Sequence, residues 1–205
     1  MPDPGERTRR QLWDERHGAS DPVEAHEPDP TLVEVASALP PGRALDLGCG
    51  DGRNATALAA AGWSVTAVDF SGVGLARAQA RAERDGLVVT WRQADLLEWA
   101  PEPAAFDLVL LMFIHLPLAE RERVYAAAAA AVAPGGTLLV VGHDRTNLAD
   151  GVGGPQDPDV LFTASEVAAA LPDGFSVVRA EAVRRGAGER VPIDAVLVAR
   201  SVPAA

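Results

Sequence analysis

The residues with the clearest chemical potential lie in one short segment, Ala44-Leu-Asp-Leu-Gly-Cys-Gly-Asp-Gly-Arg-Asn54. An apolar run ends at Leu47, three glycines follow at alternate positions, and helix-forming residues begin at Asn54. Glycines tolerate positive φ and let a ligand approach the backbone, while a helix N-terminus offers free N–H groups and a positive dipole end. The segment therefore predicts a strand, a tight turn and a helix that bind an anionic group such as a phosphate or a carboxylate. A tight turn without a ligand is the alternative.

Two classes of ligand compete for this loop. The dinucleotide fingerprint G-x-G-x-x-G would place its third glycine at position 53, but the chain has Arg53 there and the third glycine is Gly52. The observed pattern is D-x-G-x-G-x-G, with Asp46 two residues before Gly48. A carboxylate attracts the ammonium group of an amino acid and repels a pyrophosphate. The loop therefore favours a ligand with an amino-acid portion, and an NAD-dependent oxidoreductase is the first alternative.

Further motifs follow the loop in a fixed order. Asp69 ends an apolar run about 20 residues after Asp46, the spacing of an acid that binds ribose hydroxyls. Gln93-Ala-Asp95 follows the next apolar run, and Pro134-Gly-Gly-Thr-Leu-Leu-Val140 is a turn that leads into a further apolar run. Together with Asp46-Leu-Gly-Cys-Gly-Asp-Gly52, these motifs resemble those of class I S-adenosylmethionine-dependent methyltransferases. For Asp69, a simple helix cap is the alternative, although Ser71 is the better cap.

The resemblance covers roughly residues 40 to 200. Trp13-Asp-Glu-Arg16 and Gly52-Arg-Asn54 are similar, more narrowly, to the tellurite-resistance and thiopurine-methyltransferase-like branch. The resemblance implies S-adenosyl-L-methionine as cofactor and Asp95 as the acid facing the adenine amino group. Because Asp46, Asp69 and Asp95 are expected at three different strand ends and on different parts of the ligand, we expect no metal site. The cofactor-binding positions that the resemblance implies are Asp46, Gly48, Cys49, Gly50, Asn54, Asp69, Phe70, Ala94, Asp95, Leu96 and Met112. Cys49 could also be a redox-active or nucleophilic thiol, and a small packed side chain is the plainer interpretation.

Two histidines follow expected strand ends, where ligands bind in open α/β sheets. His115 lies in Phe113-Ile-His-Leu-Pro117, and His143 lies in Gly142-His-Asp144. We expect His143 or His115 to be the catalytic base for an acceptor that must lose a proton, with Asp144 orienting His143. Turn residues that bond only to backbone or water are the alternative for both.

Three side chains are expected to bind the acceptor: Trp13, His17 and His115. The segment from Arg145 to Phe162 is rich in Gly, Pro and acids. Loops of this length are usually functional or disordered, so we expect it to form part of the substrate pocket, with a mobile linker as the alternative.

The elements that must position these residues alternate. Apolar runs indicate strands near residues 43–47, 64–69, 87–92, 106–113, 137–141, 175–183 and 191–200, with helical patterns between most of them. The last two runs have no helix between them, so they should pair antiparallel. The pattern predicts a Rossmann-like, doubly wound α/β fold whose seven-stranded sheet is mostly parallel and ends in an antiparallel hairpin.

The N-terminal part is more polar. Residues 7–17 and 31–39 are expected to form helices, the second capped by Thr31, with a loop over residues 21–30. We expect an N-terminal helical cap segment at residues 1–40 and the methyltransferase domain at residues 41–202.

The composition limits the partners. The 205 residues include 18 basic side chains, all Arg, and carry a net charge of −11. That charge disfavours nucleic acids and anionic membranes, and the lack of Lys excludes Lys-based Schiff-base or P-loop chemistry. The single Cys and the absence of an apolar leader favour the cytoplasm. We expect a methyltransferase for a small-molecule acceptor, active as a monomer or homodimer. An RNA or protein methyltransferase stays open as a second class of function, and a non-catalytic binding module as a third.

Overall fold

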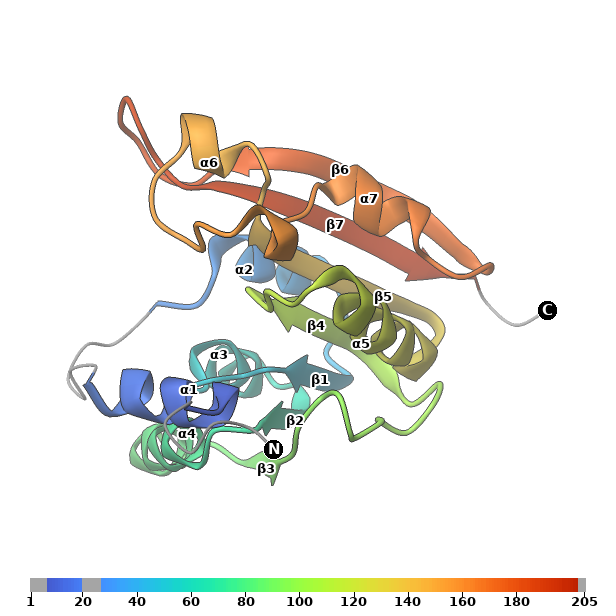
Figure 1. Cartoon of the computed structure of the whole chain (residues 1–205). Coiled ribbons are helices and arrows are strands. Elements are labelled where there is room, and N and C mark those ends of the chain that lie inside the picture. Colours follow the sequence, from blue (N-terminus) through green and yellow to red (C-terminus); the bar gives the residue numbers. More distant parts are fainter. Residues whose placement is uncertain (1–6, 20–26, 203–205) are drawn as a thin grey trace.

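The computed structural model describes residues 7–19 and 27–202, and it has a seven-stranded sheet at its centre (Figure 1). The strand order is β3-β2-β1-β4-β5-β7-β6. The strands are β1 (Arg43–Leu47), β2 (Ser64–Asp69), β3 (Val89–Gln93), β4 (Phe106–Met112), β5 (Val132–His143), β6 (Phe175–Arg184) and β7 (Ile193–Ser201).

The pairing confirms the predicted topology. Strands β1 to β5 pair in parallel, whereas β7 pairs antiparallel with both β5 and β6. The last hairpin therefore inserts its second strand beside β5. Strands are added on one side of β1 up to β3 and on its other side from β4 onward, so the carboxyl ends of β1 and β4 form the switch point at which this class of sheet binds ligands.

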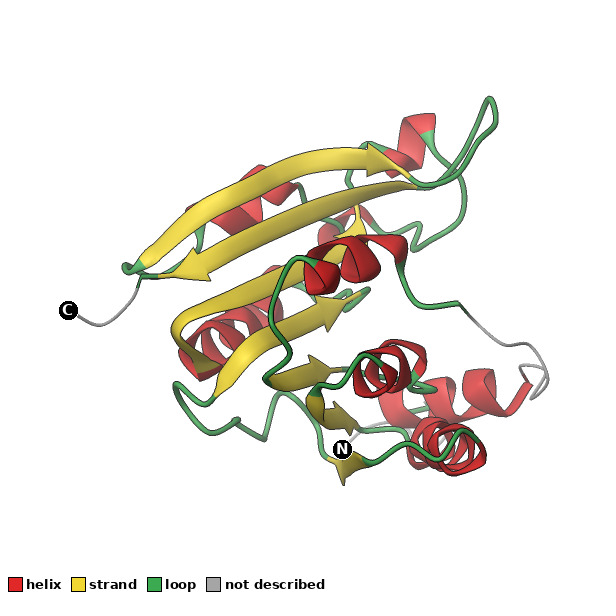
Figure 2. Cartoon of the chain, turned by 180° about the vertical axis from the view of Figure 1, so that it is seen from behind, coloured by secondary structure: helices red, strands yellow, loops and turns green. Residues whose placement is uncertain are grey.

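Helices cover both faces of the sheet (Figure 2). They are α1 (Arg9–Ala19), α2 (Pro30–Ser37), α3 (Arg53–Ala60), α4 (Gly72–Arg84), α5 (Leu118–Ala131), α6 (Asn147–Asp150) and α7 (Ala164–Ala169), with a 3₁₀ turn at Pro158–Val160. One core layer joins the sheet to α5 and α7, and the other joins it to α2, α3 and α4. Because successive residues of β1 and β4 point into opposite layers, these strands need continuous apolar sequence.

The helix caps test the local predictions. Ser71 caps α4 by accepting from the Gly74 N–H, and Thr163 forms the predicted capping box with Glu166. The predicted cap of α2 by Thr31 is wrong. Asp29 is the N-cap and accepts from the Thr31 N–H, because the helix begins with Pro30, which has no N–H to lose. The short α6 and the 3₁₀ turn were not predicted.

The N-terminal segment divides into two unlike helices. Helix α1 buries no residue, whereas α2 buries Leu32 in the core layer of α3. Most of the predicted loop at 21–30 lies outside the described residues. The packing of Leu32 supports assigning α2 to the methyltransferase domain and leaving α1 alone as the cap segment. The division into a cap and a domain remains a proposal. Among the helices described, none has the length and hydropathy that crossing a bilayer requires.

Candidate functional site

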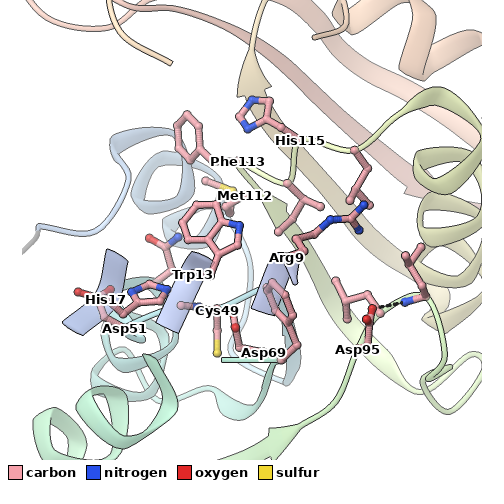
Figure 3. A pocket seen from close by; sticks show the side chains of 18 of the residues that line it. Arg9, Trp13, His17, Cys49, Asp51, Asp69, Asp95, Met112, Phe113 and His115 are labelled. Carbon is pink, nitrogen blue, oxygen red and sulfur yellow. Dashed lines mark hydrogen bonds between the residues drawn. The ribbon is translucent and has the colours of Figure 1, made fainter. Parts of the chain in front are cut away.

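A cavity opens at the carboxyl ends of β1, β2 and β4, beneath α1 (Figure 3). In this view Asp51, Asp69 and Asp95 lie along one side, Phe113 and His115 lie on the opposite side, and Trp13 lies between them. The cavity therefore has an acidic half, built on β1 to β3, and an aromatic and imidazole half, built on β4.

The glycine loop joins β1 to α3 in the acidic half. Gly48, Gly50 and Gly52 have φ values of +72°, +54° and +76°, which side chains rarely adopt. A Cβ at Gly48 would overlap Cδ1 of Ile114, so a side chain at this position would require the Ile114 side chain to move as well as a positive φ. The N–H groups of Gly48 and Cys49 donate to the Val68 carbonyl and hold the loop against β2.

Asp46 lies directly beneath this loop. Its side chain is 1% exposed, and neither carboxylate oxygen has a hydrogen-bond partner among the described residues. Burial, with Asp69 nearby, raises the pKa of Asp46 to about 7. The Arg53 guanidinium and the Ala55 N–H lower that pKa only in part, because neither makes a hydrogen bond of normal geometry to the carboxylate. The loop thus covers a buried acid that lacks a compensating group.

Asp69 connects the loop to the next helix. One carboxylate oxygen accepts from the Gly50 N–H and the other from the Ser71 N–H, each at 2.8 Å. Burial raises the pKa of Asp69, and the two N–H groups partly offset that effect. Because a carboxylate can accept about four hydrogen bonds, Asp69 keeps capacity for hydroxyl donors in the cavity that it lines.

Helix α1 closes the cavity from above through polar contacts. Asp14 accepts from the Ser71 hydroxyl, and Arg9 pairs with Glu120 of α5 at 2.8 Å. The ring of His17 lies over the loop, since a Cβ at Gly50 would be 3.3 Å from its Cε1 atom. Helix α1 therefore contacts both halves of the site while burying none of its own residues.

His115 begins the opposite half. Phe113, two residues earlier, has a φ of +58°. This conformation is costly for residues other than glycine, and it turns the chain into the cavity. Nε2 of His115 accepts from the backbone N–H of His143 at 3.0 Å. Burial lowers the pKa of His115 to about 4, and the neighbouring His143 adds to this effect. His115 is therefore a neutral hydrogen-bond acceptor whose Nε2 lone pair is already used.

His143 faces a different acid from the one predicted. Its Nδ1 atom lies 3.4 Å from Oδ1 of Asp194, the residue opposite it in the β5–β7 pairing. The predicted orienting role of Asp144 is wrong, because its carboxylate accepts from the N–H and hydroxyl of Thr146 at 2.9 and 2.7 Å. Successive residues at a strand end point to opposite sides, so the acid next to His143 in sequence cannot also lie beside its ring.

Comparisons with known proteins agree with this geometry. Residues 44–136 match a family model described as a methyltransferase domain. Over 105 residues the chain is 35% identical to ubiquinone biosynthesis O-methyltransferase of Caulobacter sp. (strain K31), covering 51% of this chain and 42% of that protein. Over residues 44–136 the chain therefore carries a methyltransferase domain of the S-adenosylmethionine-dependent kind. The family recognised in the sequence, and S-adenosylmethionine as its cofactor, are confirmed.

Solved structures show the same methyltransferase fold. The N-methyltransferase NodS from Bradyrhizobium japonicum WM9, in complex with S-adenosyl-L-homocysteine, matches with a TM-score of 0.72 at 18% identity, covering 93% of this chain and 97% of that one. TehB from Haemophilus influenzae matches with a TM-score of 0.69 at 20% identity, covering 84% and 62%. The chain spans about half the length of the curated relatives it matches.

Most of the predicted cofactor positions line the methyltransferase cavity. The exceptions are Asp46, buried under the loop, and Ala94, which packs against a core layer. The three predicted acceptor-binding side chains, Trp13, His17 and His115, also line it. The nine cofactor positions that line it are Gly48, Cys49, Gly50, Asn54, Asp69, Phe70, Asp95, Leu96 and Met112.

Sequence reasoning missed several cavity residues. Arg9 and Arg53 bring positive charge, and Phe113 brings an aromatic face that lies 5.8 Å from the Arg53 guanidinium carbon. Asp51, Leu97, Ile114 and Leu116 complete the set. In the sequence, Arg53 stands out only as the residue where a dinucleotide fingerprint needs glycine. For Cys49, burial raises the pKa well above its ordinary value, which supports the interpretation as a packed thiol.

The segment from Arg145 to Phe162 does not line this cavity, so its predicted place in the wall of that pocket is wrong. Asn147 holds the segment by donating to the Gly153 carbonyl and accepting from the Ile193 N–H. Gly154 packs on the ring of His143, where a Cβ would lie 2.5 Å from Cδ2. The segment therefore covers the back of His143.

Proposed function

We propose that this protein transfers a methyl group from S-adenosylmethionine to a small-molecule acceptor. The observation that carries the proposal is the acidic half of the cavity, with Asp69 and Asp95 in its wall and Asp46 beneath the loop. An ammonium group and neutral ribose hydroxyls suit these carboxylates, whereas the pyrophosphate of NAD would meet three acids. The buried, unpartnered Asp46 fits a cationic ligand above it.

The residues that would hold this cofactor follow from their positions. Asp69 has free acceptor capacity for ribose hydroxyls, and Asp95, fixed by the Leu97 N–H at 2.9 Å, can accept from the adenine amino group. Phe70 and Leu96 offer apolar surface beside them. Asp46 does not reach the cavity, so it acts on an ammonium group as a charge under the loop. When bound, S-adenosylmethionine supplies a methyl group on a positively charged sulfur.

The aromatic and imidazole half of the cavity would bind the acceptor and is called the acceptor half; its lining suits a small substrate. Trp13 and Arg9 lie over the entrance on α1, and Phe113, Met112 and Ile114 provide an apolar wall. The net charge of −11 disfavours binding of RNA. We further propose a cytoplasmic enzyme, active as a monomer or homodimer, in line with its single buried thiol, Cys49, and acidic surface.

His143 is the better candidate for the catalytic base. The Nε2 atom of His115 is occupied by the His143 N–H, and its low pKa makes it a poor base near neutral pH. His143 is not among the residues that line the cavity. Its ring centre lies 5.4 Å from those of His115 and Phe113, which do line it, and its side chain is 12% exposed. Hydrogen bonds of a catalytic base often tighten only when substrate is bound, so this position is compatible with proton removal from an acceptor.

The choice of acceptor draws on the relatives. Those named ubiquinone biosynthesis O-methyltransferase favour an acceptor hydroxyl, and the fold shared with TehB keeps the tellurite-resistance branch as a proposal. An acceptor screen should therefore begin with phenols and small thiols, followed by oxyanions.

Calorimetric titration tests the donor site first. We expect one-to-one binding of S-adenosylmethionine and S-adenosylhomocysteine, no binding of NAD, and a loss of about 100-fold or more in affinity in Asp69→Ala. Asp85→Ala, at the end of α4 and away from the cavity, is the matched control and should bind normally. Binding of NAD without either methyl donor would contradict the proposal.

A further inference from the structure

We propose that Asp194 and Arg185 are positioning residues that fix the ring of His143 and set its basicity. The inference rests on the proposed function, because it concerns the candidate base of that reaction. These residues come from the last hairpin of the fold, about 40 to 50 positions after His143 in sequence.

The sheet register places Asp194 beside His143. The two residues are paired across the antiparallel strands β5 and β7, and Oδ1 of Asp194 lies 3.4 Å from Nδ1 of His143. Asp194 is 3% exposed, and both of these atoms lack any other hydrogen-bond partner among the described residues. Because these two buried polar atoms face one another and no other partner, a small rotation of the His143 ring would form a hydrogen bond between them.

Arg185 holds the other side of the carboxylate. Its Nε atom donates to Oδ2 of Asp194 at 2.7 Å, and its guanidinium carbon lies 5.3 Å from the centre of the Phe113 ring. The carboxylate therefore cannot turn away from His143 without losing a charge-assisted hydrogen bond. Arg185 in turn rests on the aromatic residue whose strained backbone shapes the cavity wall.

This arrangement selects one form of the imidazole. A hydrogen bond from Nδ1–H to Asp194 leaves the lone pair on Nε2, so Nε2 is the nitrogen that can accept a proton. Proton transfer at Nε2 then forms an N–H bond while the acceptor's own bond to hydrogen breaks, and the electron pair stays on the acceptor atom. Asp194 stabilises the resulting imidazolium, and the proton does not move to the carboxylate.

The charged and titratable groups that face His143 are few. His115 stacks on its ring from the segment after β4, Asp194 faces it from β7, and Arg185 lies behind Asp194. The covering segment contributes the backbone of Gly154. The pKa of His143 is lowered by burial, raised by Asp194 and lowered by Arg185, so the two positioning residues act on it with opposite signs.

NMR titration of the full chain tests this inference without turnover. Among the four histidines of the chain, the signal of His143 is identified as the one lost in His143→Gln. We expect the Nδ1–H tautomer for His143 in the unsubstituted protein, and a fall in its pKa of about one pH unit in Asp194→Asn. Asp144→Asn is the matched control, because Asp144 is also 3% exposed and adjoins His143 in sequence, yet its carboxylate bonds to Thr146. Equal pKa values in Asp194→Asn and the unsubstituted protein, or an equal shift in Asp144→Asn, would overturn the inference.

Arg185→Gln provides a second test if Asp194→Asn does not fold. The side chain of Arg185 is 36% exposed, so its replacement should be tolerated. The β5–β7 pairing keeps Asp194 beside His143 without Arg185, and removing the cation removes its repulsion of the imidazolium, so the pKa of His143 should rise. An unchanged or lower pKa in Arg185→Gln would contradict the proposed arrangement.

Kinetics then separate this inference from the proposed function. Asp194→Asn should lower kcat about 10- to 100-fold with little change in the KM for the methyl donor. In a His143→Ala background the same substitution should have no further effect, because Asp194 acts through His143. Absence of turnover in the unsubstituted protein would count against the proposed function, and the NMR titrations would still decide whether Asp194 and Arg185 control His143. An equal loss of kcat in both backgrounds would show a general structural role and overturn the inference.

Discussion

The two halves of the cavity are built in opposite ways. The acidic half would bind the methyl donor and is called the donor half. Its main residues lie at the ends of three adjacent parallel strands and come from one stretch of about 50 residues: Asp46, the three loop glycines, Asp69 and Asp95. In the acceptor half, His115 lines the cavity, whereas His143, Arg185 and Asp194 lie outside its lining. These four residues come from separate segments brought together by β4, β5 and the last hairpin. The first half is a local motif, whereas the second depends on strand register.

The electrostatics of the two halves differ in the same direction. Burial makes an acid in the donor half hard to ionise and a histidine in the acceptor half hard to protonate. A cationic ligand above Asp46 would therefore favour the ionised form of this carboxyl. The acceptor half offers neutral imidazoles to a group that must lose a proton.

The largest effect is expected where the donor half depends on backbone geometry. A Cβ at Gly52 would lie 2.6 Å from Cβ of Ala78 and 2.8 Å from Cη2 of Trp91, at a φ of +76°. Gly52→Ala should lower the free energy of unfolding by about 4 kcal/mol in denaturant titration, since it combines steric overlap with left-handed strain. Gly86→Ala is the control, because Gly86 has a φ of +65° and open space around it, so it should cost only about 1 kcal/mol. Equal losses would mean that strain alone, and not packing against α4 and β3, restricts the loop.

The same contrast explains what the sequence could predict. Strand ends, the glycine loop, Asp69 and the Ser71 cap follow from short patterns, because each depends on neighbours in the chain. The β5–β7 register depends on pairing between residues about 50 positions apart, so no local pattern places Asp194 beside His143. The wrong choice of Asp144 followed from adjacency in sequence. The predicted alternation of side chains in a strand, applied to both strands of the hairpin, could have suggested an acid on the facing strand.

A smaller effect should distinguish the donor half by its response to pH. Asp46 keeps its proton in the folded state up to about pH 7, whereas the unfolded chain loses it near pH 3.8. The folded state therefore binds more protons in this range, and its stability should fall as pH rises from about 4 to about 7. Asp46→Asn removes that loss, so we expect it to be about 2 kcal/mol more stable than the unsubstituted protein at pH 8 and nearly equal at pH 4.5. Thermal unfolding at the two pH values measures the difference.

The stability gained in Asp46→Asn should be accompanied by a loss of affinity for the methyl donor. Asp46→Asn should bind S-adenosylmethionine more weakly, because the buried charge beneath the loop is lost. A stability change that is the same at both pH values would show that the Asp46 carboxylate is ionised throughout, and would remove the electrostatic contrast between the halves.

The acceptor half should respond to pH in the opposite direction and more weakly. His115 has a folded pKa of about 4 against an ordinary value of 6.5, so the unfolded chain binds the extra proton between these values. Its contribution is present above pH 6.5 and is lost as pH falls towards 4. His115→Gln keeps an acceptor for the His143 N–H, and it should reduce the loss of stability between pH 7.5 and pH 4.5 by about 1 kcal/mol in thermal unfolding. If His115→Gln gave the same acid limb as the unsubstituted protein, burial of His115 would not govern acid stability. The proposal that His115 remains neutral while His143 accepts the proton would then lose its main support.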